Sequence, residues 1–164
     1  MSDDPTHLIH DGTEQQAEEN NIITTMTCAP NITQVAVRAC FGAKKLIRVD
    51  LPEGITIIGD WSFCGCISLK EIKFPKSLTS IGLQSFANCS SIEKVDLLHT
   101  KVQELGTRAF NYCTSLREMK VPDSLQTFGH AVFGACFELV PSDINTLNNS
   151  AIVAHLRSKQ LHHL

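Results

Sequence analysis

The sequence has few aromatic residues, no long apolar run and none of the common catalytic signatures. Only 6% of its 164 residues are aromatic, and a single tryptophan is present. No stretch of about 18 apolar residues occurs, so we expect no membrane-spanning segment. A nucleophile elbow, a Walker loop, a dinucleotide-binding fingerprint and a HExxH helix are all absent. We therefore expect that the protein is not an enzyme and holds no cofactor.

Lysine and arginine are absent from residues 1–21, which hold six of the 17 acidic residues. This segment is polar and lacks a hydrophobic period, so we interpret it as a disordered acidic tail. It has neither a basic n-region nor an apolar h-region, and we therefore expect no secretory signal and a cytoplasmic location. Removing those six acids from the 17 leaves 11 beside 14 basic residues. The resulting charge of about +3 is too weak and too dispersed to indicate nucleic-acid binding.

The middle of the chain repeats with a period of about 23 residues. The clearest copies occupy residues 46–68, 69–91, 92–115 and 116–138. The third of these has one extra residue, which we expect to bulge a loop near Lys101. A drifted copy at residues 23–45 precedes them, and a degenerate copy begins at Leu139. A fixed period of this size is typical of a repeat architecture, in which each unit is stable only against its neighbours.

Each repeat is expected to combine a strand with a turn. In residues 69–91, Ile72 and Phe74 alternate with polar residues, which predicts a short strand with these two side chains facing inward. Phe86 and Cys89 follow on what we expect to be a short helical piece. Stacking successive repeats predicts three buried columns: Ile58/Ile81/Leu105/Phe128, Phe63/Phe86/Phe110/Phe133 and Cys66/Cys89/Cys113/Cys136.

The repeat pattern LxxIxFPxSLTSIGxxSFxNC resembles the leucine-rich repeats of the BspA type, which are also described from Treponema. The resemblance covers roughly residues 23–140. It implies an α/β fold, a leucine-rich-repeat solenoid in which a right-handed superhelix carries a parallel β-sheet on one face and short helical turns on the other. It also implies a role in binding, with no catalytic residues to carry over.

The chain departs from the general leucine-rich pattern after each strand. Where that pattern has asparagine or cysteine, this chain has small or hydroxylated residues, so we expect no asparagine ladder. These residues are Gly54, Ser77, Thr100 and Ser124.

We divide the chain into three parts. Residues 1–21 are the predicted tail, and residues 22–140 form a leucine-rich repeat domain of about five repeats. Residues 141–164 form a C-terminal cap, in which Ile152 and Leu156 recur at helical spacing and predict an amphipathic helix. We expect this helix to cover the open end of the last repeat, where the sheet would otherwise show an unpaired edge.

The seven cysteines are an odd number, and four of them recur with the period of the repeat. Their Cβ vectors are expected to run parallel rather than toward one another, which disfavours disulfides. We interpret them as buried reduced thiols. A zinc site would have to use Cys64 and Cys66 or the terminal pair His162 and His163, but neither pair has the spacing of a zinc finger or ribbon, so we expect no metal.

The predicted strands place charged residues on the side away from the core, here called the strand face. Their sign alternates along two columns: Arg48, Glu71, Lys94 and Glu118 in the first, and Asp50, Lys73, Asp96 and Lys120 in the second. Neighbouring strands lie about 4.8 Å apart, so each charge should have neighbours of opposite sign on several sides. The pattern either fixes the register of a solvated sheet or docks a complementary partner, and these eight residues are our candidate partner-binding residues.

Trp61 is the alternative candidate for partner binding. Its repeat equivalents are Gln84, Arg108 and Ala131, none of them large and apolar, so we expect the tryptophan to be exposed. Tryptophan is enriched among the anchors of protein interfaces.

These patterns together predict a monomeric, non-catalytic module for protein–protein interaction or scaffolding, with an unidentified protein partner and neither nucleic acid nor membrane. The alternative is a cell-surface adhesion module that binds a host protein or glycan.

Overall fold

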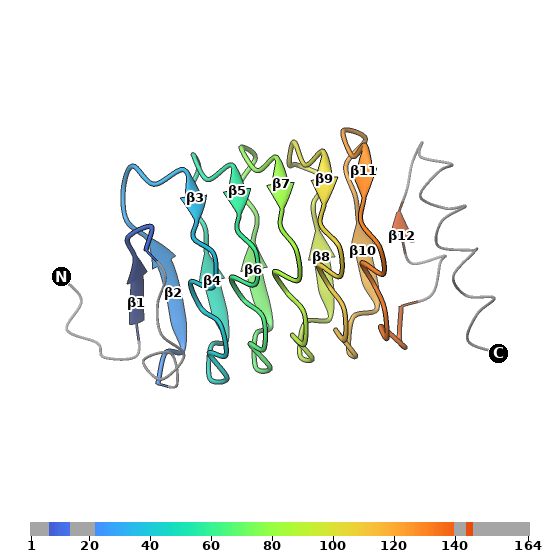
Figure 1. Ribbon diagram of the computed structural model, residues 1–164, viewed down its shortest axis with the longest axis horizontal. Coiled ribbons are helices and arrows are strands. Elements are labelled where there is room, and N and C mark those ends of the chain that lie inside the picture. The colour runs from blue at the N-terminus through green and yellow to red at the C-terminus, as the bar shows by residue number, and fades with distance from the viewer. Residues whose placement is uncertain (1–6, 14–21, 140–143, 146–164) are drawn as a thin grey trace.

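The chain is a solenoid of short parallel strands arranged in two ladders (Figure 1). The computed structural model describes residues 7–13, 22–139 and 144–145. The first ladder contains β1 (His7–His10), β2 (Thr25–Cys28), β4 (Arg48–Asp50), β6 (Glu71–Lys73), β8 (Lys94–Asp96), β10 (Glu118–Lys120) and β12 (Ile144–Asn145). The second ladder contains β3 (Gln34–Val35), β5 (Ile57–Ile58), β7 (Ser80–Ile81), β9 (Glu104–Leu105) and β11 (Thr127–Phe128).

Equivalent residues of successive repeats lie side by side in the ladders. In the second ladder, Ile57 lies beside Ser80, an offset of 23 residues. Ser80 in turn lies beside Glu104, an offset of 24 residues. The extra residue is therefore accommodated in the loop between β8 and β9, which contains Lys101, in agreement with the prediction.

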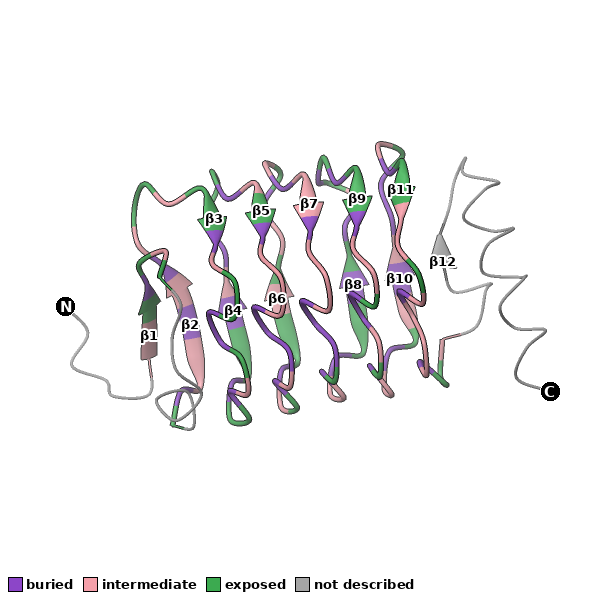
Figure 2. Cartoon of the chain, viewed as in Figure 1, coloured by how far each residue is buried: buried purple, intermediate pink, exposed green. Residues whose placement is uncertain are grey.

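The buried hydrophobic residues form one continuous core along the solenoid. Figure 2 shows buried residues in the successive repeats. Phe63, Phe86 and Phe110 are fully buried. Their rings stack, with centroids 5.1 Å apart between Phe63 and Phe86 and 5.2 Å apart between Phe86 and Phe110. This spacing is close to the distance between neighbouring strands, so the sheet sets the separation of the rings. The predicted columns are confirmed, although Phe128 and Phe133 in the last of these repeats are only half-buried.

The predicted short helical pieces are wrong, because the described residues contain strands and turns but no helix. After β5, the N–H groups of alternate residues point to the next repeat: Trp61 donates to the carbonyl oxygen of Leu83 over 2.9 Å, and Phe63 to that of Ser85 over 2.8 Å. Between them, the N–H of Ser62 donates to the carbonyl oxygen of Gly59, three residues back. A helix directs every N–H along its own axis. The bonds between repeats, and the φ of 53° at Trp61, are incompatible with that geometry.

Small polar side chains add further bonds between repeats. The hydroxyl of Ser77 donates to the carbonyl oxygen of Ile55 over 2.7 Å, and that of Ser124 to Val102 over 2.8 Å. Serine hydroxyls therefore make inter-repeat bonds at two of the positions where the general pattern has asparagine or cysteine.

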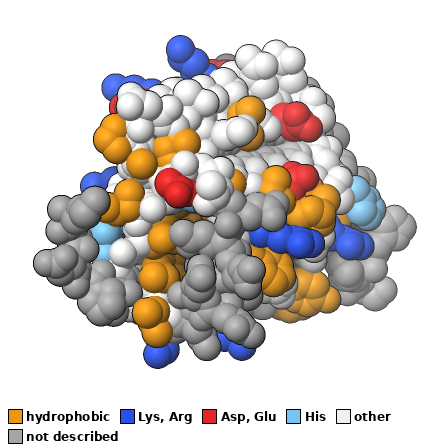
Figure 3. Space-filling view, turned by 60° about the vertical axis from the view of Figure 1, so that its left-hand side comes forward, with side chains coloured by type: hydrophobic (Ala, Val, Ile, Leu, Met, Phe, Trp, Pro, Cys, Tyr) orange, Lys and Arg blue, Asp and Glu red, His pale blue; other side chains and the backbone are white. Residues whose placement is uncertain are grey.

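Strand β1 lies within the segment predicted as a disordered tail. His7–His10 pair in parallel with β2, so the prediction of disorder is wrong for these four residues. Residues 1–6 and 14–21 lie outside the described residues. Viewed with the N-terminal side turned forward, the surface shows hydrophobic side chains interspersed with charged ones (Figure 3).

At the other end, β12 falls within the predicted C-terminal cap and pairs with β10, with Ile144 beside Met119. The predicted capping helix lies outside the described residues.

Candidate binding face

The strand face is formed by the outward side chains of β4, β6, β8 and β10, and it carries all eight candidate residues. The register within each pair of strands places opposite charges side by side, as the sequence predicted. These neighbours are Arg48 and Glu71, Asp50 and Lys73, Lys94 and Glu118, and Asp96 and Lys120.

The charges on β8 and β10 are fully paired with one another. Lys94 Nζ lies 2.9 Å from Glu118 Oε2, and Lys120 Nζ lies 3.2 Å from Glu118 Oε1 and 3.3 Å from Asp96 Oδ2. Hydrogen bonds from Lys94 and Lys120 lower the pKa of Glu118. Hydrogen bonds to Glu118 and Asp96 raise the pKa of Lys120. All four groups are solvent-exposed enough that such pairs add little to stability.

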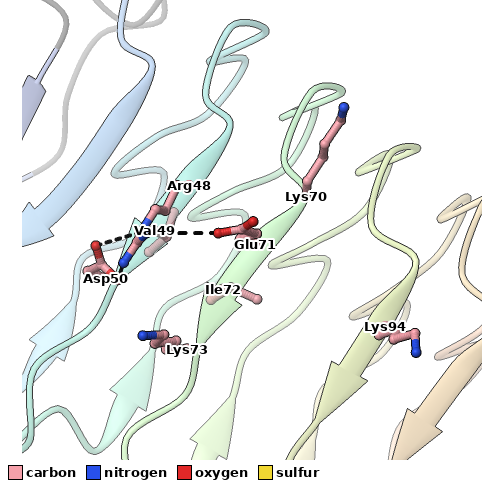
Figure 4. A pocket seen from close by; sticks show the side chains of 8 residues that line it. All are labelled: Arg48, Val49, Asp50, Lys70, Glu71, Ile72, Lys73 and Lys94. Carbon is pink, nitrogen blue, oxygen red and sulfur yellow. Dashed lines mark hydrogen bonds and ion pairs between the residues drawn. The ribbon is translucent and has the colours of Figure 1, made fainter.

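The charges on β4 and β6 are only partly paired (Figure 4). Arg48 forms a two-point contact with Asp50 of the same strand, at 2.9 and 3.0 Å, and this raises the pKa of the guanidinium group. Its other partner is Glu71, at 3.9 Å. Lys73 has no ion pair within the described part of the chain.

Lys73 is left unpaired within the described residues because Asp50, its neighbour on β4, contacts Arg48, and because the first ladder breaks between β6 and β8. Hydrogen bonding joins β1, β2, β4 and β6 in one sheet and β8, β10 and β12 in another. At the β2–β4, β4–β6 and β8–β10 steps, two successive N–H groups donate to one carbonyl of the preceding repeat, as Arg117 and Glu118 do to Glu93. The corresponding bonds to the Lys70 carbonyl are not formed. The expectation that every charge has opposite neighbours on several sides is therefore wrong at this break.

A groove of about 250 Å³ crosses the strand face beside the break. Its walls are the two rows of charged side chains, which stand two residues apart on each strand, and Val49 and Ile72 lie between them along the strands (Figure 4). Ile72 is only half-buried, whereas the equivalent Val49 is fully buried. The residues that line the groove are Arg48, Val49, Asp50, Lys70, Glu71, Ile72, Lys73 and Lys94.

The groove thus brings together five of the eight candidate residues, while Asp96, Glu118 and Lys120 do not line it. Lys70 also lines it, and the sequence reasoning missed this residue. The signal was present in the repeat, because Glu93 and Arg117 occupy equivalent positions and form an ion pair, so the charged columns are three and not two.

Trp61 is half-buried rather than exposed, contrary to the prediction. Its Nε1–H donates to Oε1 of Gln84 over 3.0 Å, and the guanidinium of Arg38 lies 5.4 Å from the centre of its ring. The same guanidinium lies 5.9 Å from the ring of Phe41. Trp61 belongs to the turn after β5 and does not line the groove.

The seven cysteines are free thiols, and all of them are buried. In the predicted cysteine column, each thiol donates to a carbonyl oxygen of the preceding repeat, for example Cys89 to Phe63 over 3.1 Å and Cys113 to Phe86 over 3.2 Å. Burial raises the pKa of the Cys28 thiol to about 11 and also raises the pKa of Cys64. Cys28 and Cys64 therefore stay protonated at neutral pH. The thiols of the column act as structural hydrogen-bond donors.

Across the described ranges, no three histidine, cysteine or acidic side chains are grouped so that they could hold a metal ion. His162 and His163 lie outside those ranges. The same part of the chain includes no long apolar helix on the scale of a lipid bilayer.

Comparison with known proteins agrees with this architecture. The family model described as BspA type leucine rich repeat region matches residues 20–155 in six copies. A leucine rich repeat protein of T. pallidum (TpLRR) is 30% identical, with 71% of this chain and 56% of that chain covered and a TM-score of 0.67. A leucine-rich repeat protein from Bacteroides ovatus is 22% identical, with 73% of this chain and 34% of that chain covered and a TM-score of 0.65. A leucine rich cell surface protein from Faecalibacterium prausnitzii is 18% identical, with 82% of this chain and 46% of that chain covered and a TM-score of 0.65.

The chain therefore spans between about a third and just over half of the length of these proteins. The search of curated proteins found no match.

Proposed function

Because this chain belongs to the BspA-type leucine-rich repeat family, we propose that it is a non-catalytic module that binds another protein through its strand face. Repeat solenoids bind partners along extended surfaces that the stacked repeats create.

The observation that carries this proposal is the incomplete pairing of charge on β4 and β6. If the alternating charges served only to fix the register of the sheet, they would be expected to neutralise one another throughout, as they do on β8 and β10. Lys73 has no ion pair among the described residues, and the Glu71 side chain is 71% exposed with its nearest cation 3.9 Å away. These groups remain available to a partner at little cost, because few existing contacts have to be broken.

The test is an exchange of charge, Glu71→Lys together with Lys73→Glu, which leaves the net charge unchanged. It puts a lysine beside Arg48 and a glutamate beside Asp50. The wild type and the exchanged variant are used as baits in affinity capture, and the recovered partner is titrated against both. We expect the Kd to rise at least about tenfold, or about 1.4 kcal/mol. The cost in stability should stay below roughly 2 kcal/mol of cross-strand repulsion, so the variant remains folded.

Trp61→Ala is the matched comparison, because it changes the turn side and leaves the strand face intact. If the charge exchange leaves the affinity unchanged and Trp61→Ala abolishes it, the partner binds at the turn side and the proposal is wrong.

The buried free thiols support a place of action where cysteines stay reduced, and we include a cytoplasmic, monomeric state in the proposal. The second candidate function is surface adhesion to a host protein or glycan. It is favoured by the fold shared with a protein described as a leucine rich cell surface protein. A protease added outside intact native cells distinguishes the two functions. Protection of the protein from cleavage supports the cytoplasmic binding module, and cleavage supports surface adhesion.

A further inference from the structure

We propose that the groove beside the β6–β8 break binds a carboxylate side chain from an extended acidic segment of the protein partner. This inference rests on the proposed function and names the chemistry of the ligand.

The charges that line the groove leave two cations without a counter-ion. Arg48 is shared by Asp50 and Glu71, and Lys94 is held by Glu118 at 2.9 Å. Lys70 and Lys73 also line the groove, and neither has an ion pair within the described part of the chain. An anionic group is therefore the complement that the groove lacks.

The acidic wall residues decide which anion fits. Asp50 stands in the same row as Lys73, and Glu71 follows Lys70 directly in the chain, so both carboxylates repel a dianion such as phosphate more strongly than a monoanion. The planar guanidinium group of Arg48 would suit a phosphate, but it already forms a bidentate contact with the carboxylate of Asp50. Lys70 and Lys73 point away from each other (Figure 4), so a single carboxylate pairs with one of them and leaves Asp50 and Glu71 to accept N–H groups of the partner.

The shape of the groove favours an extended segment. Its walls are side chains two residues apart on the same strand, a separation of roughly 7 Å, which is enough for one extended chain and too narrow for a helix of about 10 Å diameter. The groove crosses β4, β6 and β8, so the bound segment would run along the solenoid axis.

The probe is a fluorescein-labelled peptide of eight residues in which threonine and glutamate alternate, with a second peptide that has glutamine in place of glutamate. Fluorescence anisotropy measures both against the full chain. The test variant is Lys70→Gln with Lys73→Gln. The control is Lys101→Gln with Arg108→Gln, which removes the same charge from two exposed positions outside the groove. Glutamine already occupies the repeat position of Arg108 at Gln84, so the control is compatible with the turn.

We expect the glutamate peptide to bind the wild type at least about tenfold more tightly than the glutamine peptide. The groove variant should lose this preference, and the control variant should keep it. Equal affinity for both peptides, or an equal loss in both variants, overturns the inference. The inference is also overturned if 3′-sialyllactose, a sugar acid, binds the groove while the glutamate peptide does not.

The test of the carboxylate inference can fail while the test of the proposed function succeeds. If the Glu71/Lys73 exchange abolishes capture of the partner while the glutamine variant of the groove lysines does not, the strand face binds the partner and the carboxylate inference alone fails.

Discussion

The backbone N–H of Ala36 donates a hydrogen bond over 3.0 Å to Nε2 of His10, and this bond ties β1 to the turn after β3. His10 is fully buried, and its Nδ1 has no hydrogen-bond partner among the described residues. A neutral imidazole that accepts at Nε2 carries its proton on Nδ1. A second proton would occupy Nε2 and break the bond to Ala36.

The attachment of β1 should therefore depend on pH. Burial lowers the pKa of His10 below its ordinary value of 6.5, against an opposing contribution from Asp11. Between the lowered value and 6.5 the unfolded state binds more protons than the folded state, so the stability given by neutral His10 is present above pH 6.5 and is lost as the pH falls through this window. Hydrogen exchange of the β1 amides, corrected for intrinsic rates, should accelerate from pH 7.5 to pH 5.

His10→Gln should flatten this dependence, and His130→Gln, at an exposed position, should not. An unchanged pH profile in the His10 variant would show that another group is responsible.

Phe86→Ala should destabilise the whole solenoid. The ring is fully buried between Phe63 and Phe110, so its loss removes two stacking contacts and leaves a cavity. We expect a loss of roughly 3–5 kcal/mol in urea denaturation, a large part of the stability of an ordinary domain. Tyr112→Ala, at a side chain that is 52% exposed, serves as the control. A loss below about 1 kcal/mol in the free energy of unfolding for Phe86→Ala would contradict the burial of its ring in the core.

The thiols should resist modification in the native protein. Cys66, Cys89 and Cys113 have no exposed surface, whereas Cys64, Cys136 and Cys28 are 9%, 8% and 7% exposed. Labelling with a maleimide should therefore reach Cys64, Cys136 and Cys28 first, and denaturation should expose all seven. Peptide mapping by mass spectrometry measures the order. Early labelling of Cys89 would argue against the observed packing.

Gly106→Ala should disturb the packing of one repeat on the next. An added Cβ would lie 2.5 Å from the carbonyl carbon of Gly82, and backbone atoms cannot move aside as a side chain would. We expect a loss of roughly 1–3 kcal/mol, measured by thermal denaturation. Thr127→Ala, at an exposed position in β11, provides the comparison. Equal melting temperatures for both variants would mean that the repeats can separate without cost at this point.

Much of this architecture could be predicted from the period of the sequence. A repeat places equivalent residues one above another, so Phe63 and Phe86, and likewise Arg48 and Glu71, had to meet once the register was known. The strands of the first ladder followed from alternation, since the side-chain period of a strand is two residues. The bulge near Lys101 followed from one additional residue in one copy.

The turns could not be predicted in this way. Phe86 and Cys89 have a spacing that suits a helix, but the N–H groups of Phe86 and of Gln84 donate to carbonyl oxygens of the next repeat, and only the stacked array supplies those partners. Strand β1 could not be predicted for a related reason. Its four residues lie in an acidic segment and show no repeat period, and the strand forms only because it pairs with the edge of β2.

The sequence by itself determined which residues face the core and which charges share a column, because both follow from the spacing of residues along the chain. The tertiary structure decided which of those charges are paired. Lys73 has Asp50 beside it on β4, but Asp50 contacts Arg48. The first ladder breaks between β6 and β8, and Asp96 pairs with Lys120 on the far side of the break. Ion pairs fall steeply in strength with distance, and only the folded backbone sets that distance.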